Sequence, residues 1–554
     1  MYKKTSTQLS LFDPILIFPG ILPENDWSHI YREKIYPQID EDQFKHLYCE
    51  HWGAPNKSIK LQISLLIFMN IERLTWRDAE YQFQRRLDWM NATQTACDFA
   101  NIDHTTLFKF YNRIADDEVA YEIFKKLTGM FILECNISIR HQRVDSFFMY
   151  GWLAKLSRYG LFKETNRVFL QNLRKQKPGL YDNIHQDLSR NYLQDDFDLT
   201  EKDKEKVSRK IHEMAKDMYH IKSAFENHNQ IKHYKSFQIL VKVFGQQCSI
   251  TDVEKKEGKS DHSVKIEIKK IPDGKGEQIV STPHNTDAQY TKKRNQVVTG
   301  HKGFLTETCD PDNDVQYITD VNLEAAGHSD AKEIGEIEDR LKENEFKPDI
   351  LDADAGFVNG TSILEAAEKG ISLEGPSSGR SQSIENFSKE DRPLDVADFK
   401  VEIKDDTKEL IILSCPDNEY PLDQVRSKKT GRLLVHFENK ECKKCHLQDR
   451  CPVKIGVRVS TLKVSEEQYA GARRHHKYMG SSEYRKQCAV RAGAESLVNE
   501  VANKHGARKS RHRTEKRSRL QMVFAALACN VKRYLNNAVD NCVQNQPEMI
   551  ENSC

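Results

Sequence analysis

The sequence predicts a mixed α/β protein with one sheet flanked by helices. Strand-like stretches at residues 137–150 and 303–321 are followed by alternating helix and strand as far as residue 369. This alternation favours an open mixed sheet over a barrel or a helical bundle. A helical arm precedes the first strand, and a small β-rich stretch precedes the last helices. The 554 residues suffice for roughly three to four domains of ordinary size.

The N-terminal arm has the pattern of short packed helices. Apolar residues recur at spacings of three and four over residues 59–69, as on the buried face of a helix. Thr75 lies three residues before Asp78, which predicts a capped helix start, and a further helix is expected after Asp103. We therefore predict a helical head domain over residues 1–130, which fits either DNA binding or plain packing.

The predicted sheet begins in the next segment, residues 131–375. Asp145 lies inside an otherwise apolar strand, and Asp354 lies at the end of a later strand that stops at a glycine. Between these strands we expect a helical, charge-rich insertion at about residues 151–235, followed by a short apolar strand at residues 238–245.

A linker and a small insertion come next. Residues 376–393 are rich in Ser, Gly and Pro, and the remainder of residues 376–480 contains alternating, strand-like stretches. The final unit, residues 481–540, is expected to be helical and to include a basic segment.

The basic charge is concentrated near the end of the chain. Between Arg491 and Arg533 there are eleven Lys and Arg but three Asp and Glu, a net charge of +8, so the remaining residues sum to −7. Such a cluster can neutralise nucleic-acid phosphates, although a solvated helix face is the alternative. The candidate DNA-binding residues are Arg491, Lys504, Arg508, Lys509, Arg511 and Arg513.

Thirteen cysteines, an odd number spread over a long chain, favour reduced thiols and one metal cluster over a disulfide framework. Cys442 and Cys445 have the two-residue gap that lets both sulfurs bind one tetrahedral Zn²⁺. Cys451 can join through a short loop, and the fourth ligand is Cys415 or His446. A zinc ion there would stabilise the folded insertion and would take no part in catalysis. The alternative is that these cysteines are reduced and lie in a polar loop without metal.

The sequence gives no indication of a membrane partner. No stretch approaches the ~18 uncharged apolar residues that a membrane-spanning helix requires. The residues after the first lysines are too few and too polar for a signal peptide. We therefore expect a cytoplasmic protein.

Three acids could support chemistry: Asp145 and Asp354 on strands, and Glu495 on a late helix. Two-metal phosphoryl transfer needs such a set, because two divalent cations ~3.5–4 Å apart must be held by carboxylates. Mg²⁺ prefers oxygen ligands and keeps several waters, so three carboxylates suffice. Taken singly, each acid also fits a helix cap or a turn.

With their flanking residues, these acids resemble the motifs of DDE transposases of bacterial insertion sequences. Val144-Asp145-Ser146 resembles the first catalytic strand, and residues 352–357 resemble the second motif, in which an acid precedes Ala-Gly and an aromatic residue. Residues 491–495, with the basic stretch at 504–513, are similar to the third-acid helix. The matching pieces, which span roughly residues 50 to 535, also include residues 53–89, 286–290, 301–304, 328–330 and 524–533.

The resemblance implies an RNase H-like core, with Asp145 and Asp354 on adjacent strands and Glu495 on a helix after a β-rich insertion. It implies a transposase that binds the terminal inverted repeats of its own insertion sequence, in the bacterial nucleoid. With Mg²⁺ or Mn²⁺ as cofactor it would cleave double-stranded DNA and join the freed 3′ hydroxyl to target DNA, acting as a homodimer. A domesticated, non-catalytic DNA-binding regulator and a nuclease of the same fold are the alternatives.

Each acid motif leaves one alternative open. Asp352 competes with Asp354 because alternation puts both on one face of the strand, and Asp354 is preferred because it directly precedes Ala-Gly. Glu500 competes with Glu495, from which it lies about 140° around a helix. Arg491, one turn before Glu495, fits either a phosphate clamp or an ordinary ion pair.

The third motif departs from the family at two positions. Many relatives have a Tyr where this chain has Cys488 and a Lys where it has Ala502. Tyr484 or Lys504 could substitute, so the departure bears on contacts with the DNA ends more than on metal binding.

Overall fold

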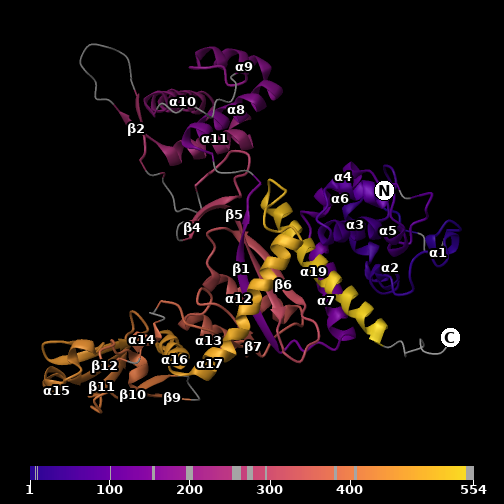
Figure 1. Cartoon of the computed structure of the whole chain (residues 1–554). Coiled ribbons are helices and arrows are strands. Elements are labelled where there is room, and N and C mark those ends of the chain that lie inside the picture. Colours follow the sequence, from indigo (N-terminus) through magenta and orange to yellow (C-terminus); the bar gives the residue numbers. More distant parts are fainter. Residues whose placement is uncertain are drawn as a thin grey trace, which may run out of the picture.

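The computed structural model places a central sheet among three groups of elements (Figure 1). N-terminal helices lie beside the long helix α19 (Glu515–Gln544), a second helical group lies beyond one end of the sheet, and a β-rich group lies beyond the other. The structure describes residues 1–5, 8, 10–99, 101–152, 156–194, 204–252, 264–270, 272, 279–293, 296–379, 383–387, 389–404 and 409–544. Among the helices in these ranges, none has both the length and the apolar character needed to cross a membrane.

The central sheet is mixed, which confirms the α/β prediction. Its strands are β1 (His141–Tyr150), β4 (Gln289–Lys293), β5 (Gln296–Thr308), β6 (Ile318–Ala325), β7 (Ile350–Asp352) and β8 (Ser372–Glu374). Their order is β4–β5–β1–β7–β8, and β6 also pairs with β5. β5 runs antiparallel to β1, whereas β7 runs parallel to β1 and β8. Helix α12 (Asp330–Glu343) leads into β7, and α13 (Gly360–Glu368) makes the crossover that the parallel β7–β8 pair requires.

The N-terminal helices start where the sequence predicts. Thr75 and Asp78 form a reciprocal capping box, with the Asp78 amide donating to Thr75 Oγ1 over 3.2 Å. The Asp103 carboxylate accepts from the Thr105 amide and caps the next helix. The helices are α1 (Pro14–Ile17), α2 (Trp27–Ile30), α3 (Ile59–Ile71), α4 (Trp76–Phe83), α5 (Leu87–Ala92), α6 (His104–Ile114) and α7 (Val119–Glu134). Their buried side chains share one core with the central sheet and α19.

The segment between β1 and β4 forms a helical group with its own core. Its elements are α8 (Arg158–Gln176), α9 (Pro178–Ile184), α10 (Lys204–Phe225), α11 (Lys235–Gln247), β2 (Cys248–Asp252) and β3 (Val264–Ile268). The strand predicted at residues 238–245 is wrong, because this stretch lies inside α11. Phe237, Leu240, Val243 and Phe244 are buried at the three- and four-residue spacing of a helix face, which a short apolar run does not distinguish from a strand.

The β-rich group has a third core, built around Val435, Phe437 and Leu462. Its elements are α14 (Ile384–Phe387), β9 (Lys400–Ile403), β10 (Leu410–Ser414), β11 (Asp423–Arg426), β12 (Leu433–Glu438), α15 (Asn439–Lys444), β13 (Lys454–Ile455), β14 (Val459–Val464) and α16 (Glu466–Gly480). The strand pairs in this group are antiparallel. α16 packs on α13 and so attaches the group to the central sheet.

The last segment is divided into short helices before α19 begins. The structure has α17 (Ser482–Cys488), a 3-10 turn, α18 (Gly493–Asn499) and a π-helical turn at Glu500–Lys504, where the sequence predicts one helix over residues 482–504. α18 packs on β1, and α19 packs on β6, α3 and α7. The end of the chain thereby joins the sheet to the N-terminal helices.

Candidate active site

The register of two parallel strands brings the first two acids together. β1 pairs with β7 through Arg143, which lies opposite Asp352. Two residues further along each chain, Asp145 follows on β1 and Asp354 follows β7. Paired residues of neighbouring strands project from the same face, about 4.8 Å apart. The pairing ends at Arg143 and Asp352, so the two half-buried acids lie just beyond the last paired residues.

The third acid comes to the same face from a helix. α18 begins at Gly493, which lies so close to the Arg143 guanidinium that a Cβ there would overlap it. Arg143 Nη1 also donates to the Val490 carbonyl over 2.9 Å. Arg143 and Asp145 are two residues apart and share a face of β1. Glu495 lies in the first turn of α18, the helix whose start contacts Arg143, and its side chain is exposed.

A gap in strand pairing exposes the edge of β1 at Asp145. On this edge β1 pairs with β7 only over His141–Arg143. At the far end the Tyr150 amide donates to the Arg508 carbonyl over 2.9 Å, and the Ser510 amide donates to the Tyr150 carbonyl over 2.7 Å. Within the described chain, residues 144–149 have no strand on this side. We call this unpaired stretch of β1, between the β7 pairing and the Arg508–Ser510 bridge, the notch.

A fourth carboxylate lies beside Asp354. Asp354 Oδ1 accepts from the Gly356 amide over 2.7 Å. Asp330 Oδ2 and Asp354 Oδ1 each lie 2.9 Å from the position that a Cβ on Gly356 would take, so both carboxylates crowd this glycine. Lys302 pairs with Asp330 over 2.6 Å, and its side chain is only 9% exposed. Residues 328–330 resemble a family motif, but the sequence does not show that Asp330 lies beside the loop of the second acid.

The two competing acids have other partners. Asp352 is buried and lies 2.6 Å from His141 Nε2, and this hydrogen bond raises the pKa of the imidazole. Glu500 Oε2 accepts from Arg533 over 2.7 Å. Burial acts to raise the pKa of Glu500, but Arg533 and nearby cations hold it below its ordinary value. Both competitors are therefore committed to contacts inside the protein.

Part of the basic segment faces the notch. Lys504 and Lys509 are exposed, the Arg508 guanidinium lies 5.6 Å from the Phe147 ring centre, and the Arg513 guanidinium lies 4.5 Å from that of Trp152. Arg491, which could have been an ordinary helix ion pair, has no carboxylate partner among the described residues. These side chains can meet phosphates at the notch.

Other cations of the +8 segment have internal partners. Arg511 Nη1 donates to the Leu74 carbonyl over 2.9 Å, which attaches the segment to the N-terminal helices, and the residue is otherwise exposed. The ring of His512 stacks on Tyr111, with 4.7 Å between the ring centres. Further pairs are Lys516 with Asp116, Arg519 with Glu324 and Glu515, and Arg533 with Glu307 and Glu500. Charge counted along the sequence therefore overstates the charge that DNA could meet.

Tyr484 and Lys504, the two residues that could substitute for the missing residues of the third motif, differ in their exposure. The Tyr484 hydroxyl is hydrogen-bonded to Glu374 and the residue is buried, whereas Lys504 is exposed. Lys504 is thus the substitute that is accessible to DNA.

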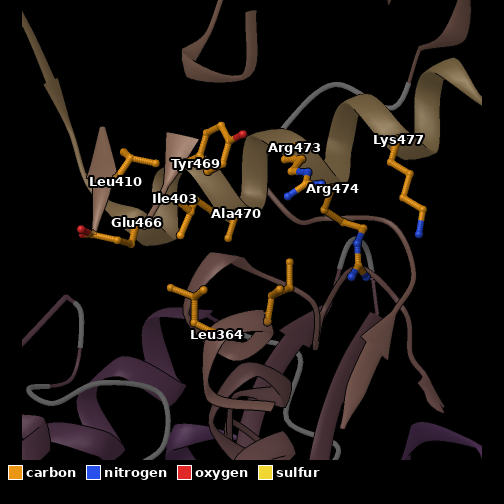
Figure 2. Close-up of a pocket in the computed structure, with 10 residues that line it drawn as sticks. Leu364, Ile403, Leu410, Glu466, Tyr469, Ala470, Arg473, Arg474 and Lys477 are labelled. Atoms are coloured by element: carbon orange, nitrogen blue, oxygen red, sulfur yellow. The ribbon is translucent and has the colours of Figure 1, made fainter. Parts of the chain in front are cut away.

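A cavity of about 530 Å³ lies between α13 and α16, and the three acids are not among its lining residues (Figure 2). Leu364 forms part of its apolar floor, and Arg473, Arg474 and Lys477 extend from α16 above it. Arg474 and Lys477 both approach Glu374, at 3.2 and 3.9 Å. Glu374 thus neutralises part of this positive charge within the protein. The cavity lies where α16 attaches the β-rich group to the sheet, and it is not part of the notch.

The four candidate zinc ligands lie together in the β-rich group. Cys415, Cys442, Cys445 and Cys451 all line one cavity of about 30 Å³. These four are free thiols, as are the other seven cysteines whose side chains the structure describes.

Two family models match this chain. The model described as "Transposase DDE domain" matches residues 414–535, which include the thiol cluster, Glu495 and most of α19. The model described as "Transposase domain" matches residues 22–113 in the N-terminal helices. Neither match extends over Asp145 or Asp354. No curated protein and no solved structure matches the chain.

Proposed function

Because the chain carries the domains of a DDE transposase of the insertion-sequence type, we propose that it cuts and joins DNA at the terminal inverted repeats of its own element. The observation that supports the proposal is the parallel pairing of β1 with β7, which ends two residues before Asp145 and Asp354, together with the packing of α18 on β1. Three carboxylates, on β1, directly after β7 and on α18, with exposed cations in the basic segment, would suit metal-dependent phosphoryl transfer on DNA.

An RNase H-like core is the second part of the proposal. The order β6–β5–β1–β7–β8, with β5 antiparallel to β1 and with β7 and β8 parallel to it, supports this topology. The helical group after β1 and the β-rich group before α18 are then insertions into one core. The N-terminal helices are proposed to take part in recognising the repeats.

The donor set fits hard divalent cations such as Mg²⁺ or Mn²⁺. Asp145, Asp354 and Glu495 offer carboxylate oxygens, the ligand type that these ions prefer, and two of the acids are only half-buried. When bound there, such ions would supply activation of water and stabilisation of the leaving 3′ oxygen. Arg491, Lys504 and Lys509 would hold the flanking phosphates, and two copies of the chain would act on paired ends.

The direct test uses a supercoiled plasmid that carries the DNA flanking this gene. We expect the purified protein to release 3′ hydroxyl ends at a defined repeat when Mg²⁺ or Mn²⁺ is present, and to join those ends to a target plasmid. Binding without cutting in either metal would instead indicate a DNA-binding regulator. Cutting without joining would indicate a nuclease.

The notch cations give a binding prediction. Lys509→Ala together with Arg513→Ala should weaken DNA binding across unrelated sequences, because each lost phosphate contact removes counterion release. The slope of log affinity against log salt should fall by about 2 for two contacts. Lys516→Ala is the matched control, since Lys516 is already paired with Asp116 at 2.9 Å. An equal slope change in the control would contradict a specific role for the notch.

The fourth carboxylate gives a second prediction. Asp330→Asn should lower the cleavage rate about tenfold while DNA binding persists, because Asp330 lies against Gly356, as Asp354 does, and neutralises the nearly buried Lys302. Asp339→Asn lies on the same helix with an exposed side chain and serves as the control. Equal cleavage rates in the two variants would exclude a positioning role for Asp330.

A further inference from the structure

The four thiols of the β-rich group come from three separate segments of the chain: the end of β10, α15 with the residue after it, and the loop before β13. Cys415 directly follows β10, Cys442 lies in α15, and Cys445 and Cys451 flank a 3-10 turn. All four line the cavity of about 30 Å³, the volume that one water occupies in the liquid. Only the two-residue strand β13 gives regular structure to the chain between Cys451 and β14.

Two of the sulfurs accept hydrogen bonds from backbone amides, as metal-bound sulfurs do. The Glu419 amide donates to Cys415 Sγ over 3.3 Å, and the Leu447 amide donates to Cys445 Sγ over 3.4 Å. Such N–H groups stabilise negative charge on sulfur.

The structure distinguishes the two candidates for the fourth ligand. Cys415 lines the cavity together with the other three thiols, whereas His446 does not. The His446 side chain is 74% exposed, and its Nδ1 lies 3.8 Å from an oxygen of Asp417. His446, Asp417 and Cys445 do form a compact group, but this group contains only one of the thiols.

We propose that Cys415, Cys442, Cys445 and Cys451 bind one structural Zn²⁺ that joins the end of β10, α15 and the loop before β13. Four sulfur donors favour Zn²⁺ over the oxygen-seeking Mg²⁺. A tetrathiolate site is coordinatively closed, so this zinc leaves no position for substrate. The proposal does not depend on whether the chain cuts DNA.

The test measures metal in the full-length protein purified without chelator. We expect one zinc per chain by elemental analysis, and loss of most of it in Cys415→Ser and Cys445→Ser. His446→Ala and Cys49→Ser, which changes an exposed cysteine in the N-terminal region, should retain the zinc. Replacing zinc by Co²⁺ should give the sulfur-to-metal charge-transfer and d–d bands of a tetrahedral tetrathiolate.

A second measurement covers variants that fail to fold. Removing metal from the wild type with a chelator should lower its melting temperature, and added Zn²⁺ but not Mg²⁺ should restore it. The proposal is overturned if the wild type contains no zinc and chelation leaves its melting temperature unchanged. It is equally overturned if His446→Ala loses the metal while Cys415→Ser keeps it. Neither result would bear on DNA cleavage, which depends on the carboxylates.

Discussion

Asp354→Asn should abolish DNA cleavage while leaving DNA binding intact. The substitution keeps the shape of the side chain, including an oxygen that can accept from the Gly356 amide, but removes the charge that would hold a cation. Loss of a metal ligand of this kind costs about 4 kcal/mol of transition-state stabilisation, which is about a thousandfold in rate. The measurement is the rate of 3′ end release at saturating protein, with binding followed separately.

Asp352→Asn is the matched control for this experiment. Asp352 lies two residues away but is buried against His141 at 2.6 Å, so its loss should act through stability. We expect this variant to keep most of the cleavage rate below its melting temperature. If Asp354→Asn cleaves DNA at the normal rate and Asp352→Asn does not cleave it, the second acid is Asp352 and not Asp354.

Glu307→Gln should give the largest loss of stability. Glu307 lies on β5 with its side chain 1% exposed, and it pairs with Arg143 at 2.6 Å and with Arg533 at 3.0 Å. Removing the shared carboxylate leaves two guanidinium groups, both more than four-fifths buried, with one negative partner fewer. Breaking a buried pair in this way costs about 3–5 kcal/mol. Denaturant unfolding should show this loss.

The control for Glu307 is an exposed ion pair of the same region. Asp116→Asn breaks the pair with Lys516, whose side chains are about two-thirds exposed, and should cost at most about 1 kcal/mol. Because Arg143 also bonds to the Val490 carbonyl just before α18, Glu307→Gln should lower cleavage even where the protein remains folded. Equal losses of stability in the two variants would contradict a structural role for the buried network.

Local signals in the sequence predicted local structure well. The capping box at Thr75 and Asp78 is formed by residues three apart, so the sequence alone contains both partners. The sequence predicts a strand at residues 238–245, which lie in α11, because a short apolar run fits a strand and a helix equally well. The stretch is helical because its apolar face packs against other helices of the same group, and this packing cannot be predicted from the run alone.

The site depends on contacts between distant residues. Alternation along a strand cannot separate Asp352 from Asp354, and the decisive partner, His141, is 211 residues away. Charge along the basic segment cannot show that Arg511 bonds to Leu74, which lies 437 residues away. Asp330 was overlooked for the same reason, since its closeness to Asp354 arises only when α12 and β7 pack on one sheet.

The shared core of the N-terminal helices and α19 has a consequence for how the protein is made. This core contains buried residues from Tyr31 to Leu535, so the first helices to leave the ribosome lack part of their packing until the last helix follows. Glu495 and the Arg508–Ser510 bridge to β1 also arrive late in synthesis. If the proposed function holds, a nascent or prematurely terminated chain would lack the third acid and the far wall of the notch, and would leave chromosomal DNA uncut.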